Sequence, residues 1–161
     1  MAEIRVGLGI DLHRADPARP LSLGGVRFDG EPGLAGHSDG DVVCHALADA
    51  RLGAAGLGDL GERFPDSDPA WAGIGGLDLL ERAARLVRDA GFAPEGFDLT
   101  FIAERPMIGG RRDEIRASLA GALGISPSRA SVKATRPEGL GWSGDGAGCL
   151  AVASVAVRDP G

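Results

Sequence analysis

The order of strand-like and helix-like segments is the feature of this 161-residue sequence that most constrains its fold. Apolar patterns typical of strands occur at residues 3–10, 97–103, 130–135 and 150–157. Helical periodicity, with apolar residues every three or four positions, occurs at residues 41–55, 77–90 and 111–123. Strands interleaved with helices predict an α/β (α+β) sandwich, in which a mixed sheet of about four strands has three helices packed on one side.

Length and composition predict a single domain spanning residues 1–161, because the chain is long enough to bury a core of its own. The net charge of −6 argues against nucleic acid and anionic membranes as partners. No apolar stretch approaches the length of a membrane span, and the amino terminus lacks the apolar region of a secretion signal. We therefore expect a cytoplasmic protein, with Cys44 and Cys149 as buried, reduced side chains.

All three histidines lie in two short polar clusters. Residues 7–14 read GLGIDLHR, and residues 36–45 read GHSDGDVVCH. Asp11 and His13 are two positions apart, so on a strand both side chains face the same way. Together with His45 they offer a carboxylate and two imidazoles, which suit Zn²⁺ and leave a fourth position for substrate or water. The alternative is that these polar residues only satisfy one another in loops and at a helix start.

A polar stripe is expected along the first of the three helices. His45 falls four residues after Asp41 and four before Asp49, which places the three on one side of a helix. Ser38 or Asp39 is expected to cap the helix start. Two roles remain open for Asp49: a solvated side chain, or a partner that orients His45 from behind.

Short motifs follow one another in a fixed order along almost the whole chain. They are GLGIDLH at 7–13, HSDGDVVCH at 37–45, GDLG at 58–61, FPDSDP at 64–69, VKAT at 132–135 and GLG at 139–141. Any one of these motifs alone would be a weak signal, but the ordered set is highly specific. It resembles the 2-C-methyl-D-erythritol 2,4-cyclodiphosphate synthase family of the non-mevalonate isoprenoid pathway.

The resemblance implies a lyase that acts as a homotrimer, with active sites in the clefts between neighbouring subunits. The family converts 4-diphosphocytidyl-2-C-methyl-D-erythritol 2-phosphate into the 2,4-cyclodiphosphate and CMP. The implied cofactors are one Zn²⁺ per subunit and Mg²⁺ or Mn²⁺ with the substrate diphosphate. Such an intramolecular phosphoryl transfer needs the reacting phosphates held in line and their charge offset, more than it needs covalent catalysis.

The resemblance also implies a role for individual residues. The residues that match the zinc ligands are Asp11, His13 and His45. Those that match the methylerythritol pocket are His37, Ser38, Asp59, Gly61 and Asp66. Those that match the cytidine diphosphate contacts are Ala103, Pro106, Thr135 and Arg136. Glu138 matches the carboxylate for the second cation, and the expected catalytic residues are Arg136 and Glu138.

Some of these assignments have purely structural alternatives. His37 is either a pocket residue or a capping or surface histidine. Asp59 stands between glycines and could instead form a turn, and Asp66 could serve only its loop.

Four positions depart from the family pattern. Met107 stands where the family usually has a lysine, and Arg136 stands where it usually has a threonine. Because a guanidinium can donate hydrogen bonds to two phosphate oxygens at once, Arg136 could compensate for the missing lysine. The pair could equally mark a diverged zinc-binding paralogue with another phosphate ester as substrate, or a non-catalytic ligand-binding trimer. Asp145 and Ala147 replace an arginine and a glutamate of the threefold channel, so no anionic lipid phosphate is expected there.

Overall fold

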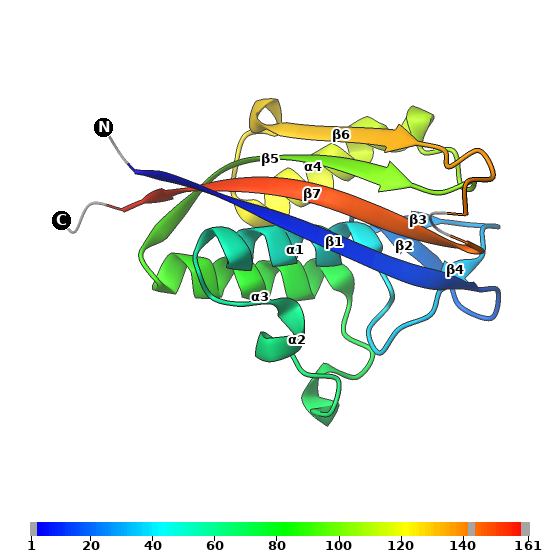
Figure 1. Cartoon of the computed structure of the whole chain (residues 1–161), viewed down its shortest axis with the longest axis horizontal. Coiled ribbons are helices and arrows are strands. Elements are labelled where there is room, and N and C mark those ends of the chain that lie inside the picture. The colour runs from blue at the N-terminus through cyan, green and yellow to red at the C-terminus, as the bar shows by residue number, and fades with distance from the viewer. Residues whose placement is uncertain (1–2, 142–143, 159–161) are drawn as a thin grey trace.

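A five-stranded sheet runs the length of the molecule in the computed structural model, which describes residues 3–141 and 144–158 (Figure 1). The strand order is β4-β1-β7-β5-β6. These strands are β1 (Ile4–Asp16), β4 (Gly33–Leu34), β5 (Phe92–Ile102), β6 (Ala130–Thr135) and β7 (Gly146–Val157). Only β5 and β6 pair in parallel, and the other neighbours are antiparallel. A separate hairpin joins β2 (Leu21–Leu23) to β3 (Val26–Phe28).

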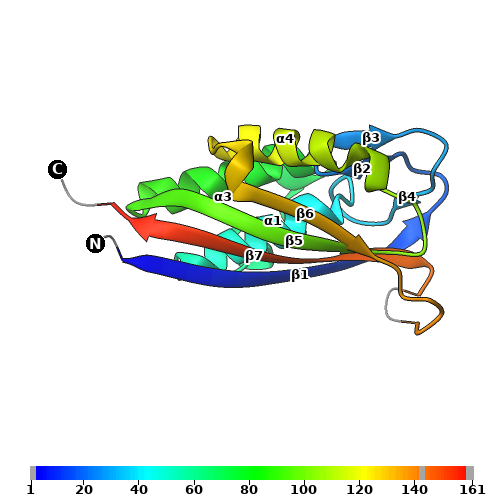
Figure 2. The ribbon, with the colours of Figure 1, turned by 90° about the horizontal axis from the view of Figure 1, so that it is seen from above.

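Three long helices cover one side of the sheet, as Figure 2 shows from above. They are α1 (Val42–Ala54), α3 (Gly76–Asp89) and α4 (Arg112–Leu123). The short helix α2 (Leu60–Arg63) and the single turns Pro69–Trp71, Gly109–Arg111 and Pro127–Arg129 lie in the connections. The predicted class, a mixed sheet with three helices on one side, is therefore confirmed.

The number and lengths of the strands differ from the sequence expectation of about four. The fifth strand, β4, has only two residues and pairs with the end of β1, so it carries no periodicity of its own. β1 continues to Asp16 because it pairs with β7 as far as Arg14, with His13 opposite Ala147, and its last two residues then pair with β4. At Gly146 a Cβ would lie 1.9 Å from the His13 carbonyl oxygen, so only glycine fits at this end of the ladder. Asp11 and His13 consequently lie within a strand.

Two glycines bring helix α1 close to strand β1. A Cβ at Gly7 would lie 2.1 Å from the carbonyl oxygen of Ala50, and one at Gly9 would lie 2.0 Å from that of Ala46. The helix backbone therefore rests directly on the strand backbone. This close approach places the first turn of α1, with His45, beside the polar end of β1.

Several predictions about the environment of the chain can be compared with the structure. Cys44 and Cys149 are buried free thiols, and burial raises the pKa of both. Within the residues that the structure describes, no helix combines the length and the apolar character needed to cross a membrane. The cytoplasmic location and the extent of the domain stay predictions.

Candidate metal and substrate site

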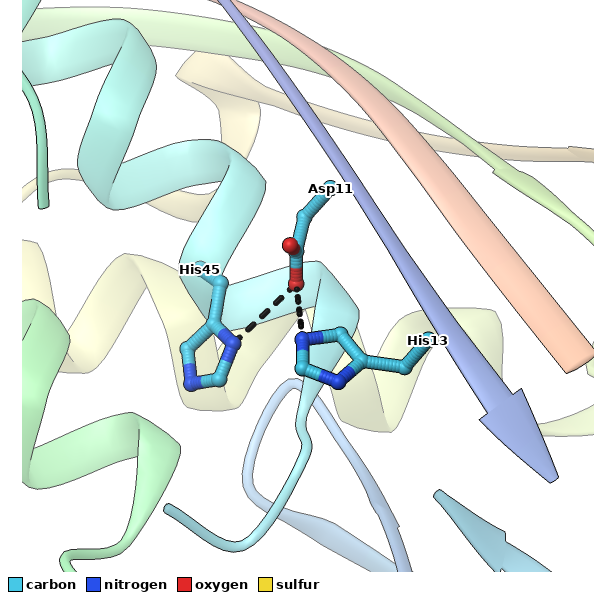
Figure 3. Close-up of side chains that lie close together, drawn as sticks. All are labelled: Asp11, His13 and His45. Carbon is cyan, nitrogen blue, oxygen red and sulfur yellow. Dashed lines mark hydrogen bonds and ion pairs between the residues drawn. The ribbon is translucent and has the colours of Figure 1, made fainter. Parts of the chain in front are cut away.

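Asp11, His13 and His45 meet where strand β1 passes the first turn of helix α1 (Figure 3). Asp11 Oδ2 lies 2.9 Å from His13 Nε2 and 3.1 Å from His45 Nδ1. One donor atom from each residue falls within 4.8 Å of the other two. A carboxylate oxygen and two imidazole nitrogens at this spacing can converge on one divalent cation, so the donor set fits a metal ion.

The electrostatics of this cluster centre on Asp11. Burial raises the pKa of the Asp11 carboxyl, but hydrogen bonds with His13 and His45 outweigh that effect and hold the pKa at about 2. The hydrogen bond to Asp11 likewise raises the pKa of His13, against the opposing effect of burial. Asp11 is therefore a carboxylate at neutral pH, which is the form that binds metals.

The start of helix α1 is fixed by Asp41, which is completely buried. Its carboxylate accepts hydrogen bonds from the N–H groups of Val43 and Cys44 in the first turn, at 3.1 and 3.0 Å. It also accepts from Gly24 and Gly25 in the β2–β3 turn, at 2.9 and 2.8 Å. Asp41 thus joins the hairpin to the helix that carries the third metal-site residue.

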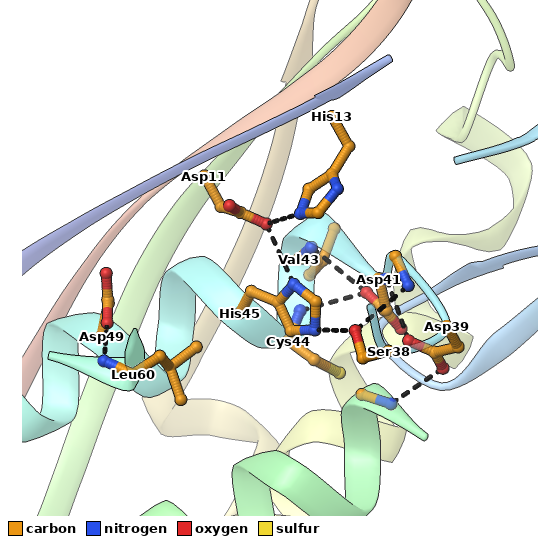
Figure 4. Close-up of polar contacts among 12 residues, drawn as sticks. Asp11, His13, Ser38, Asp39, Asp41, Val43, Cys44, His45, Asp49 and Leu60 are labelled. Carbon is orange, nitrogen blue, oxygen red and sulfur yellow. Dashed lines mark hydrogen bonds and ion pairs between the residues drawn. The ribbon is translucent and has the colours of Figure 1, made fainter. Parts of the chain in front are cut away.

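Two predictions about this helix were wrong. Asp41, rather than Ser38 or Asp39, caps α1 (Figure 4). Asp39 instead accepts a hydrogen bond from the N–H of Gly76, at the start of α3. Because Asp41 is turned into the core, it shares no polar stripe with His45 and Asp49.

Asp49 has a structural role that the two sequence interpretations did not include. Its carboxylate accepts a 2.7 Å hydrogen bond from the N–H of Leu60, so it anchors the start of helix α2 (Figure 4). Its side chain also lines the same cavity as His45. Burial raises the pKa of Asp49.

A cavity of about 470 Å³ opens beside the Asp11, His13 and His45 cluster. The sequence-predicted residues on its wall are His37, Ser38, Asp59, Gly61 and Asp66. The structure therefore brings the whole predicted methylerythritol pocket together with the predicted zinc ligands. Apolar residues that the sequence analysis missed also line the cavity, and Phe64 and Trp71 pack edge to face with ring centroids 5.1 Å apart. The FPDSDP motif and the following tryptophan are the sequence signals that could have found them.

Asp59 has a structural role and also lies on the cavity wall. Its carboxylate accepts a 2.8 Å hydrogen bond from the N–H of Glu62 and caps helix α2, while its side chain also borders the cavity. Oδ1 of Asp66 lies 3.8 Å from Nδ1 of His37, so this loop residue faces the histidine of the predicted pocket.

A second cavity of about 320 Å³ lies at the ends of β5 and β6. The sequence-predicted nucleotide and cation residues on its wall are Ala103, Pro106, Thr135, Arg136 and Glu138. Met107 lines it as well, with its sulfur 3.7 Å from Nη1 of Arg136. Two of the four positions that depart from the expected family pattern are therefore in contact.

The two cavities have no lining residue in common among those that the structure describes. Glu138 belongs to the second cavity and lies apart from the three-residue metal cluster. A substrate that contacts both sets of residues would need the two cavities to face each other.

Comparisons with known proteins agree over the full length of the fold. A family model described as the YgbB family matches residues 4–158. The chain is 50% identical over 155 residues to a Symbiobacterium thermophilum protein named 2-C-methyl-D-erythritol 2,4-cyclodiphosphate synthase, covering 95% of this chain and 99% of that protein.

Solved structures are equally similar. The bifunctional IspDF of Campylobacter jejuni matches with a TM-score of 0.93 and 38% identity, over 99% of this chain and 44% of that one. The CDP complex of IspF from Plasmodium falciparum matches with a TM-score of 0.82 and 30% identity, over 97% of each chain. The chain thus spans the length of single-activity relatives and less than half of this bifunctional chain.

Proposed function

The chain belongs to the YgbB family, and we propose that its two cavities are the two halves of a cyclodiphosphate synthase active site. The enzyme is a phosphorus–oxygen lyase of the non-mevalonate isoprenoid pathway. It converts 4-diphosphocytidyl-2-C-methyl-D-erythritol 2-phosphate into 2-C-methyl-D-erythritol 2,4-cyclodiphosphate and CMP. The observation that carries the proposed site is the convergence of Asp11, His13 and His45 beside a polar cavity.

Asp11, His13 and His45 are the proposed ligands of one Zn²⁺ ion. The donor set of one carboxylate and two imidazoles supports zinc, and all three side chains line the cavity. A zinc ion held by these residues would supply a Lewis acid for the charge on phosphate oxygens. The same cluster supports the proposal that this chain, like its family, depends on a metal ion.

The pocket residues hold the methylerythritol portion of the substrate. His37, Ser38 and Asp59 offer polar groups that can hydrogen-bond the diol, and Gly61 and Asp66 complete the same wall. Fixing the diol aims the 2-phosphate at the phosphorus under attack instead of leaving that phosphorus to water. The apolar side chains of the cavity help to exclude water from the reaction.

The second cavity holds the nucleotide. Ala103 and Pro106 line it from the loop that follows β5, and Thr135 lines it from the end of β6. Arg136 supplies a cation that can offset the charge of the diphosphate, in place of the lysine expected at Met107. Glu138 is the proposed protein ligand of Mg²⁺ or Mn²⁺, since such hard cations keep several waters and take few carboxylates.

We propose that the chain forms a homotrimer in which one subunit's metal cavity faces its neighbour's nucleotide cavity. The support is the face of the sheet that no helix covers (Figure 2). Apolar side chains project from alternate positions of β1 and are about half exposed; they are Ile4, Val6, Leu8, Ile10 and Leu12. Such a row of exposed apolar residues is typical of a protein interface. Sedimentation of the purified protein is expected to give three times the 16.4 kDa chain mass.

The test of the activity is to incubate the purified protein with its substrate, Zn²⁺ and Mg²⁺ and to follow the phosphorus NMR spectrum. CMP and the cyclic diphosphate are expected to appear together. CMP without the cyclic product would indicate a hydrolase and would contradict the proposal.

The contact between Met107 and Arg136 favours one second candidate, a diverged paralogue that acts on another phosphate ester. A zinc-loaded sample that fails to turn over the cytidyl substrate would select this candidate. Turnover at a rate that drops when Arg136 is replaced would select the synthase.

A further inference from the structure

A single loop, residues 35–38, contacts both histidines of the metal cluster from behind. His13 Nδ1 donates to the carbonyl oxygen of Ala35. His45 Nε2 lies 2.9 Å from the hydroxyl oxygen of Ser38, which also accepts from the N–H of Gly40 at 3.3 Å (Figure 4). The loop therefore meets the outer nitrogen of each ring, while the inner nitrogens face Asp11.

These contacts select the ring nitrogens that can bind a metal. An imidazole nitrogen binds a metal only when it carries no proton, so the proton resides on the other nitrogen. For His13 and His45 that other nitrogen is the one held by the loop. Hydrogen bonds of this kind fix the tautomer and the orientation of a metal-binding histidine.

The loop backbone also lies close to the His13 ring at Gly36. A Cβ at Gly36 would lie 2.9 Å from Cε1 and 3.1 Å from Nδ1 of His13. The position of the loop backbone therefore limits where the ring can lie.

Arg19 holds this loop in place from the turn that follows β1. Its guanidinium donates through Nη1 to the carbonyl oxygen of Gly36 at 2.7 Å and through Nη2 to that of Ser38. The backbone of Arg19 is itself anchored, since its N–H donates to Asp16 at 3.0 Å and its carbonyl accepts from Gly33 at 3.0 Å. The two carbonyls that it binds flank His37, so the same contact orients a pocket residue.

We propose that Arg19 is a positioning residue for the metal site: by bridging the carbonyls of Gly36 and Ser38, it fixes the loop that orients both His13 and His45. The inference rests on the proposed function, because it presumes that these histidines bind the metal. Arg19 lines neither of the two cavities, and its hydrogen bonds reach the metal site through the loop. A planar guanidinium suits this task because its fork of donors reaches two acceptors at once, which a single ammonium group cannot do in the same geometry.

The test compares zinc affinity, measured by competition with a chromogenic chelator, in Arg19→Met, Arg19→Lys and the unchanged protein. Loss of a group that orients a metal ligand typically lowers metal affinity by about 10–100-fold. Arg19→Met is expected to show such a loss, and Arg19→Lys is expected not to restore it. The matched control is Arg27→Ala, because the Arg27 side chain is exposed and its Nε pairs with the exposed Asp29 at 3.3 Å.

Two further measurements separate positioning from general destabilisation. The absorption spectrum of Co²⁺ bound in place of zinc reports ligand geometry, and it is expected to change in Arg19→Met at a temperature where the protein remains folded. Ser38→Ala is expected to lower zinc affinity as well. The double variant with Arg19→Met is expected to lose less than the product of the single effects, because both act through one loop.

The outcomes that overturn the inference are distinct from those that overturn the function. Unchanged zinc affinity and an unchanged cobalt spectrum in Arg19→Met would overturn this inference alone. Zinc binding by the unchanged protein no tighter than by His45→Ala would overturn the metal site itself, and the inference with it.

Discussion

The metal cavity and the nucleotide cavity are built in different ways. The proposed metal ligands lie on a strand and a helix whose backbones are in contact at Gly7 and Gly9, and a buried Asp41 fixes the helix start. The proposed nucleotide cavity lies at strand ends. Two of its loop residues are exposed to solvent: Met107, at 70% exposure, and Arg136.

This difference accounts for two of the four positions at which the chain departs from the expected family pattern, Met107 and Arg136. A change in the metal cluster would leave a buried carboxylate or imidazole without its partner, and such losses are costly. A change on an exposed loop costs little stability and can be offset by a neighbour in contact with it. Met107 and Arg136 form such a contact.

The largest effect is expected from removing a metal ligand. His45→Ala is expected to lower kcat by at least about 1,000-fold, because metal catalysis of this kind contributes several kcal/mol. Zinc content is expected to fall with it. The matched control is His37→Ala, which lies in the same cavity but outside the ligand set and is expected to keep its zinc. Full zinc occupancy in His45→Ala would refute the ligand assignment.

In the nucleotide cavity, the missing lysine at Met107 and the proposed compensation by Arg136 can be reversed separately. Arg136→Thr is expected to lower kcat/KM by about 10–100-fold, since a hydrogen bond to a charged group contributes about 1.5–3 kcal/mol. Zinc affinity is expected to stay unchanged.

Adding Met107→Lys to Arg136→Thr restores the family pattern and is expected to recover most of the lost kcat/KM. A double variant more active than the unchanged protein would instead show that the two residues serve another substrate.

Helix α1 also contains a buried arginine that lowers the free energy of unfolding. Arg51 is fully buried, and no acceptor among the described residues meets its guanidinium nitrogens. Burial, followed by repulsion from Arg88, lowers the pKa of Arg51 from its usual 12.5 to about 10. A shift of this size corresponds to a destabilisation of about 3 kcal/mol while the group is charged.

Arg51→Leu is therefore expected to raise the free energy of unfolding at pH 7 by about 1–3 kcal/mol, measured by urea denaturation. The gain in stability of Arg51→Leu over the unchanged protein is expected to shrink only above pH 10, because Arg51 of the folded unchanged protein then loses its charge. Arg85→Leu on the exposed side of α3 is the control, and it is expected to change stability by less than about 0.5 kcal/mol. A stability loss in Arg51→Leu would mean that the guanidinium has a partner.

The smallest effect concerns the strands that lead to the nucleotide cavity. Asp98 on β5 and Lys133 on β6 form an ion pair at 2.5 Å, with both side chains about half exposed. Burial raises the pKa of Asp98, but the hydrogen bond from Lys133 outweighs it and lowers the pKa.

Because the lowered pKa favours the folded state only while Asp98 is charged, its contribution is present at pH 7. It is lost as the pH falls below 3.8 through the lowered pKa. Asp98→Asn is expected to cost about 0.2–1 kcal/mol at pH 7 in urea denaturation and progressively less as the pH falls below 3.8. A cost that does not shrink as the pH falls would assign the effect to packing instead.

The sequence predicted the bounds of the long helices and of one strand closely. β6 occupies the predicted residues 130–135, and the three long helices begin and end within one residue of their predicted ranges. Asp11, His13 and His45 were found because their residue types already imply metal chemistry. The match to an ordered set of motifs then supplied His37 and Asp59.

The rest depended on contacts between distant segments. Asp41 caps α1 because it also binds the turn at Gly24, and no pattern within the helix indicates that partner. Arg19 and Asp49 bind backbone groups at Gly36 and Leu60, which every residue possesses. Side chains with backbone partners leave no signature in the sequence, so their roles appear only when the chain is folded.

The central claim is that the metal cavity of one subunit works with the nucleotide cavity of another. It is tested most directly by co-expressing two inactive variants, His45→Ala and Arg136→Ala/Glu138→Ala, with different affinity tags. Hybrid trimers purified through both tags contain a junction where an intact metal cavity meets an intact nucleotide cavity. The account predicts that they release CMP and cyclic diphosphate although neither parent does. Hybrids as inactive as both parents would contradict it.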